Sequence, residues 1–150
     1  MKTITIVFII CVSLGASPTR ACTFDGVFNN PFMESYPDAL DVALATHRQV
    51  SEGTITKPTL REGIPGLQQT SWWLKLLAKD LNTMLMEDTY FYIIDSHLWA
   101  KKKMGMLEIH VTKPTKNKKV LILSAAALSS IVTGEISYKN ALELGVAKLK

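Results

Sequence analysis

Residues 119–150 constrain the fold most, because four consecutive apolar residues near their start predict a strand that is buried on both faces. The run Val120–Leu123 is short and partly β-branched, which suits an interior strand better than a solvent-exposed one. Ser124 follows directly and is typical of a helix cap. Apolar residues then recur at helical spacing at Ala125, Leu128, Ile131 and Val132. This region therefore predicts a buried strand that passes straight into a helix.

A turn, a second short helix and a final strand are predicted after it. Gly134 can take the left-handed conformation with which helices often end. Ser137 is a cap for a helix that would bury Ala141, Leu142 and Leu144. Gly145 stops that helix, and residues 146–150 are predicted to run on as a strand with Val146 and Lys148 on one face and Ala147 and Leu149 on the other.

This pattern resembles the C-terminal part of the sterol carrier protein-2 (SCP2)-like lipid-binding fold. The most particular element is the run Thr133–Ser137, TGEIS, followed by Ala141 and Gly145. The resemblance implies helices beside a mainly antiparallel sheet, with an apolar ligand tunnel between the two layers. Any strand-helix-helix-strand terminus with good caps remains the alternative.

The N-terminus is typical of a secretory signal. Lys2 precedes an apolar run over residues 4–14, and small residues follow, so residues 1–21 are predicted to be a signal peptide that is too short to span a bilayer. The cleaved protein would be periplasmic or secreted. Cys22 would then come first, and an acylated lipoprotein is an alternative that Arg20 argues against.

Residues 22–34 are predicted to be a docked N-terminal arm and residues 35–150 a single domain. Charge is distributed unevenly along this chain. Residues 22–100 carry 5 basic and 10 acidic side chains, whereas residues 101–150 carry 10 basic and 3 acidic ones. Anionic lipid headgroups or an acidic protein would fit the lysine-rich part, and secretion argues against nucleic acid as a partner.

Two helices are predicted in the first half of the domain. The first begins at Ser35–Asp38, ends near residue 52 and turns one apolar face inward, formed by Leu40, Ala43, Leu44, His47 and Val50. Residues 53–69, with three Gly and two Pro, are predicted to be a loop. The second helix would start at Thr70 or Ser71, with an apolar set made of Trp73, Leu74, Leu76, Leu77, Leu81 and Leu85.

Strand signals follow. Residues 89–99 are rich in aromatic and β-branched side chains, and residues 105–111 alternate with period two, with Leu107, Ile109 and Val111 on the buried side. The charged link Ala100–Lys103 would join them into an antiparallel hairpin. The predicted fold is α+β, with a small, mainly antiparallel sheet of three to four strands and helices packed on one face.

No catalytic motif is recognisable, and we expect no enzyme activity and no cofactor. Asp95 with His97, and Glu108 with His110, are spaced two apart on the expected hairpin strands. They could together hold a divalent metal, although a solvated polar face explains the same alternation. His47 is interpreted as a core or rim histidine.

The aromatic second helix and first strand would face each other across the predicted tunnel. The candidate ligand-binding residues are Trp73, Leu77, Phe91, Ile93, Trp99, Leu107 and Ile109. The predicted function is a non-enzymatic binder or carrier of a lipid or other apolar small molecule. The alternatives are an accessory or sensor-partner domain with a filled cavity, acting on a periplasmic or membrane protein, and a metal-binding periplasmic protein.

Overall fold

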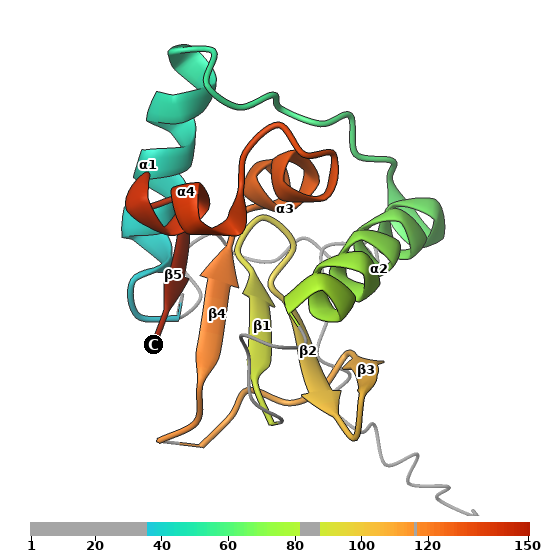
Figure 1. The fold of residues 1–150 in the computed structure, drawn as a ribbon. Helices are drawn as coiled ribbons and strands as arrows, with labels where there is room; N and C mark the ends of the chain where they lie inside the picture. Colours follow the sequence, from blue (N-terminus) through green and yellow to red (C-terminus); the bar gives the residue numbers. More distant parts are fainter. Residues whose placement is uncertain (1–35, 82–87, 116) are drawn as a thin grey trace, which may run out of the picture.

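A computed structural model describes residues 36–81, 88–115 and 117–150 of the chain. The predicted signal peptide, the N-terminal arm, Cys22, Ser35 and Leu85 lie outside the described residues. The elements are α1 (Ala39–Ser51), α2 (Gly63–Asp80), β1 (Tyr90–Ile93), β2 (Leu98–Lys103), β3 (Met106–Ile109), β4 (Val120–Leu123), α3 (Ala125–Val132), α4 (Tyr138–Glu143) and β5 (Ala147–Leu149). The α+β prediction is confirmed (Figure 1).

The sheet has five strands in the order β3-β2-β1-β4-β5, which is one or two more than predicted. Three of its neighbouring pairs are antiparallel, and β1 and β4 are parallel, with Phe91 opposite Leu121. The chain makes two hairpins from β1 to β3 and then crosses back to place β4 on the free side of β1 (Figure 1). The sheet is therefore mixed.

The hairpin prediction was wrong in its boundaries. The predicted single strand 89–99 is interrupted by a turn at residues 94–97, and the expected charged link Ala100–Lys103 belongs to β2. Alternate side chains of β2 point to opposite faces, so Lys101 and Lys103 lie on the more exposed face, whereas Lys102 is buried on the face of Leu98 and Ala100. The turn that joins β2 to β3 is Met104-Gly105, and both residues have positive φ.

The main core lies between one face of the sheet and helices α2, α3 and α4. Its fully buried sheet residues include Phe91, Ile93, Leu121 and Leu123. A second, smaller cluster on the opposite face contains Ala39 and Val42 from the start of α1 with Tyr92, Val120 and Ile122. Helices thus cover parts of both faces, and the prediction that they pack on one face alone was wrong.

The inward face of α1 also differs from the prediction. Leu40 and Leu44 are 66% and 59% exposed, whereas Val42 is fully buried. The helix begins against one face of the sheet, and its later residues Ala45 and Val50 pack against the main core on the other side. Because α1 contacts two separate core clusters, its buried residues do not form one continuous stripe along the helix.

The cap of α2 is Glu62, eight or nine residues before the predicted cap at Thr70 or Ser71, and the helix begins at Gly63. Pro65 falls in the first turn of the helix, where its missing N–H costs little. Gly66 and Thr70 are buried, and α2 packs against α3. The Gly- and Pro-rich composition of residues 63–69 was therefore mistaken for a loop signal, whereas residues 53–62 do lie outside any helix or strand, as predicted.

The C-terminal prediction is confirmed in its elements, but Leu142, which was predicted to be buried, is exposed. The Ser124 side chain accepts a hydrogen bond from the N–H of Ala127, and the Ser137 side chain accepts one from the N–H of Asn140. Gly134 and Gly145 follow the two helices with φ of 77° and 74°. β5 then pairs with β4 in antiparallel fashion.

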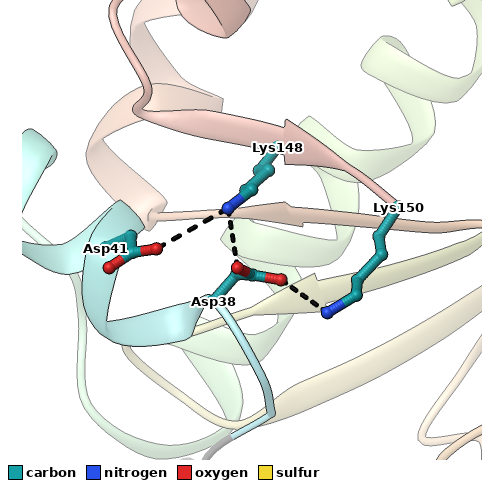
Figure 2. A network of polar contacts seen from close by, with 4 residues as sticks. All are labelled: Asp38, Asp41, Lys148 and Lys150. Carbon is teal, nitrogen blue, oxygen red and sulfur yellow. Dashed lines mark hydrogen bonds and ion pairs between the residues drawn. The ribbon is translucent and has the colours of Figure 1, made fainter.

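An ionic contact fastens the start of α1 to the last strand (Figure 2). Asp38 precedes the helix with a left-handed φ of 73°. One of its carboxylate oxygens accepts from the Lys148 Nζ at 2.6 Å and the other from the Lys150 Nζ at 2.6 Å. Lys148 also lies 3.6 Å from the carboxylate of Asp41. Hydrogen bonds from Lys148 and then Lys150 hold the pKa of Asp38 below its ordinary value of 3.8.

We expect Asp38→Asn to lower the free energy of unfolding at neutral pH. The variant should also lose less stability than the parent protein when the pH is lowered. Asn tolerates the left-handed backbone, so the variant changes mainly the charge. Because the pKa of Asp38 is lowered on folding, its contribution is present above pH 3.8 and is lost as the pH falls through the folded-state pKa. Urea unfolding at pH 7 and pH 3 should show a gap between parent and variant that narrows in acid.

Asp41→Asn is the matched control, because Asp41 is 70% exposed and its contact is long. An equal loss of stability in both variants, or a gap for Asp38→Asn that does not change with pH, would contradict the assigned role of Asp38.

Candidate functional site

Six of the seven predicted ligand-binding residues belong to one packed core. Leu77, Phe91 and Ile93 are at most 1% exposed. Trp73, Leu107 and Ile109 are partly buried and pack against the same core. These six side chains therefore belong to the packing between the helices and one face of the sheet.

Trp99 lies on the opposite face of the sheet, so it was wrongly placed with the other six. Its ring stacks on Tyr92 with centroids 4.6 Å apart and meets Tyr36 edge-on at 5.1 Å. The hydroxyl of Tyr92 hydrogen-bonds Nδ1 of His97 at 2.8 Å, and burial raises the pKa of Tyr92. This aromatic cluster covers the face that α2 does not reach.

A mainly apolar cleft opens at another place, beside the carboxyl ends of the parallel strands β1 and β4. It has a volume of about 230 Å³. Its walls come from α1, the segment after α1, the β1–β2 turn and the start of α3. The lining residues are Ala43, Thr46, His47, Val50, Lys57, Pro58, Leu60, Ile94, Asp95, Ser124, Ala125 and Ala126. Crevices at the carboxyl ends of strands, where connections diverge, are frequent ligand sites in proteins with parallel strands.

The polar side chains in this cleft are largely engaged by the protein itself. Asp95 accepts a hydrogen bond from the N–H of Ala125 at 2.5 Å, which places its charge at the start of α3. Ser124 accepts from the N–H of Ala127 and from the Thr46 hydroxyl, both at 3.0 Å. These contacts satisfy the helix terminus, so the cleft offers a ligand mainly its apolar walls.

Ser124, His47 and Asp95 line the same cleft, but they do not form a catalytic triad. Ser124 is fully buried and acts as a helix cap. Asp95 is bonded to a backbone N–H, and His47 is exposed at the rim. No hydrogen bond joins any two of the three within the described part of the chain. The nucleophile-to-base contact that such chemistry requires is therefore not present in this arrangement.

Glu135 holds one wall of the cleft in place. Its carboxylate accepts from the backbone N–H of Thr56 at 3.1 Å, from the Thr56 hydroxyl at 2.7 Å and from the Ser130 hydroxyl at 2.5 Å. The hydrogen bonds from Ser130 and then Thr56 lower the pKa of Glu135 below 4.5. Lys57 and Pro58, which follow Thr56, line the cleft. Glu135 is the acidic residue of the TGEIS run.

The paired His and acid residues are not assembled as the metal hypothesis requires. Asp95 and His97 lie in the β1–β2 turn, and Glu108 on β3 is opposite Lys101. Across residues 36–150, apart from the two undescribed stretches, no three His, Cys, Asp or Glu side chains are placed to hold a metal ion.

Comparisons with models of protein families, with curated proteins and with solved structures find no match to this chain. The helices of the described residues include none with the length and apolar character needed to cross a membrane.

The cleft residues were missed although part of their secondary structure was predicted correctly. Pro58 and Leu60 lie in a stretch that was correctly predicted to be a loop but was given no ligand role, whereas Asp95 was wrongly placed in a strand. One feature of the sequence could have indicated the position of Asp95. This residue directly follows an apolar run, and acidic side chains are stabilised near the N-terminus of a helix. The meeting of this turn with α1 depends on tertiary packing.

We expect Glu135→Gln to loosen the wall at residues 56–60 without unfolding the domain. The Glu135 carboxylate accepts three hydrogen bonds through its two oxygens. A glutamine side chain has one accepting oxygen, and its NH2 group donates instead of accepting. Hydrogen exchange followed by NMR should show faster exchange of the Thr56 amide. Glu143→Gln is the control, because Glu143 is exposed on α4 and makes one long ion pair of 3.8 Å with Lys139. Unchanged exchange at Thr56 in the Glu135 variant would refute this assignment.

Proposed function

We propose that this protein is a non-enzymatic binder or carrier of a lipid or other apolar small molecule, acting outside the cytoplasm. The observation that carries the proposal is the apolar cleft between α1, residues 57–60 and the ends of β1 and β4. Ligand sites are typically concave and apolar with a few polar groups. Here His47, Lys57 and Asp95 are the ionisable groups among the lining residues.

The size of the cleft limits what it can hold. Its volume of about 230 Å³ is below the roughly 300–1,000 Å³ of pockets that enclose drug-sized ligands. We therefore propose that it takes one end of an acyl chain or a small ring, with the remainder of the ligand outside. Lys57 at the rim suits an acidic headgroup, such as a fatty-acid carboxylate.

Three further observations support this assignment. The TGEIS run resembles SCP2-like proteins, and its Glu135 fixes a wall of the cleft. Three of the four strand pairings are antiparallel, as that resemblance implies. The N-terminal sequence is typical of an exported protein. The size and the apolar lining of the cleft suit a fatty acid or a quinone tail.

The test is a thermal-stability screen with fatty acids of increasing chain length, quinones and sterols. A ligand at a hundred times its dissociation constant should stabilise the protein by about 2.7 kcal/mol. Ala43→Phe should abolish the shift by filling the cleft from α1, where Ala43 is half-buried. Leu44→Phe on the exposed side of the same helix should leave it intact.

A screen in which no class of probe stabilises the parent protein would reject the carrier proposal. The accessory or sensor-partner domain would then be favoured, because a packed core between α2 and the sheet is what that alternative requires. Stabilisation that Ala43→Phe leaves unchanged would place the ligand elsewhere and reject the cleft as its site.

A further inference from the structure

The tip of the β2–β3 hairpin presents two exposed apolar side chains on a tight turn. Met104 is 81% exposed and Met106 is 69% exposed. Lys103 pairs with Met106, so the loop has two residues, Met104 and Gly105, with φ of 51° and 75°. Both dihedrals match the turn type that joins closely paired strands.

Methionine is an unusual choice for this turn. The first position requires a left-handed backbone, which Asn, Asp and Gly adopt far more readily than Met. Met104 thus suits neither the left-handed backbone nor the exposure to solvent at this position, which points to a role other than stabilising the fold. The turn holds the backbone in one conformation, while the thioether side chain stays flexible and adapts to an irregular apolar surface.

Lysines gather around this tip. β2 runs antiparallel to β1, and β1 runs parallel to β4, so the end of β2 and the start of β4 lie at the same end of the sheet (Figure 1). Lysines of both segments lie near Asp88. The pKa of Asp88 is lowered first by a hydrogen bond from Lys101 and further by the charges of Lys118 and Lys103. The lysine groups 101–103 and 118–119 therefore form one charged end.

Most of this positive charge is available to a partner. Lys101 pairs with Asp88 at 2.9 Å, and Lys102 is 2% exposed. Lys103, Lys118 and Lys119 are exposed and make no ion pair within the described residues. The nearby acidic groups of the described sheet are Asp88 and the exposed Glu108.

A shallow hollow beside the hairpin extends the surface. It lies between α2 and β3 and has a volume of about 480 Å³. Lys75 and Lys79 stand on its helical side, and Met106 and Leu107 supply apolar area from the strand. Both lysines are exposed. We name as the basic tip the set Lys75, Lys79, Lys103, Met104, Met106, Lys118 and Lys119.

We propose that the basic tip docks on the surface of an anionic lipid bilayer, with Met104 and Met106 inserted at the level of the headgroups. Lysines near an anionic surface are attracted to it electrostatically. Apolar side chains that insert into the bilayer are also removed from water, which a single dissolved headgroup could not achieve. A projecting turn with flexible apolar side chains fits a soft lipid surface better than the shaped pocket of an acidic protein. The proposal stands independently of the cleft and its ligand.

The first experiment is co-sedimentation of the protein, as isolated from its host, with two kinds of vesicle. One contains phosphatidylcholine and phosphatidylserine in equal parts, and the other contains phosphatidylcholine alone. We expect binding to the anionic vesicles that weakens as salt is raised. Met104→Ser with Met106→Ser should weaken it about tenfold by removing the inserted apolar area. Lys103→Gln with Lys118→Gln should weaken it roughly fivefold per lysine.

Two control variants make the same kinds of change at exposed positions away from the tip, and the lysine control is compared per lysine removed. Leu40→Ser with Leu44→Ser removes two exposed apolar side chains from α1. Lys139→Gln removes an exposed lysine from α4. Neither should alter vesicle binding. All variants share the same N-terminal region, so differences between them report on the described domain.

A second measurement observes the tip itself. In protein with ¹³C-labelled methionine methyl groups, spin-labelled anionic lipid should broaden the signals of Met104 and Met106. Three results would each overturn the proposal: equal binding to both vesicle types, equal loss in tip and control variants, or hairpin methyl signals that bound vesicles leave sharp. Retention on an acidic polypeptide without vesicle binding would also reject it in favour of a protein partner.

Discussion

The parallel pairing of β1 with β4 is the constraint on which the rest of this structure depends. All four residues of β4 are fully buried, because antiparallel β5 covers its other edge and apolar groups cover both faces. One face receives α2, α3 and α4, and the other receives the start of α1 with the aromatic cluster. A parallel neighbour also requires a crossover connection, which here contains β2 and β3. Because β4 is buried on both faces, apolar groups must cover both sides of the sheet at this strand.

This pairing also explains why the molecule has two chemically different ends. The carboxyl ends of β1 and β4 diverge into the β1–β2 turn and α3, and the apolar cleft opens between those elements and α1. The amino ends of the same strands meet the β2–β3 hairpin and its lysines (Figure 1).

The sequence predicted best where local chemistry decides the backbone. The helices α3 and α4 begin at the capping residues Ser124 and Ser137, and α4 is followed by Gly145. The elements between these residues were predicted correctly. Residues 94–97 and 63–69 were misassigned because composition alone does not show which neighbour an element meets. Gly66 looked like a breaker but is buried in α2. The cleft was missed for the same reason, since it joins four segments far apart in the chain through contacts that no short pattern contains.

The contact between Asp38 and the two lysines of the final residues has a consequence for the order of folding. It joins groups 110 and 112 residues apart, so nearly the whole domain must be arranged before it forms. Loop closure over such a separation is entropically costly unless intervening structure has already shortened the loop. During synthesis Lys148 and Lys150 emerge long after Asp38, and the β4–β5 pairing must bring them to it. The ion pairs of Asp38 therefore form only after residues 148–150 have been made, whereas Ala39 and Val42 pack on residues of β1 and β4, which come earlier in the chain.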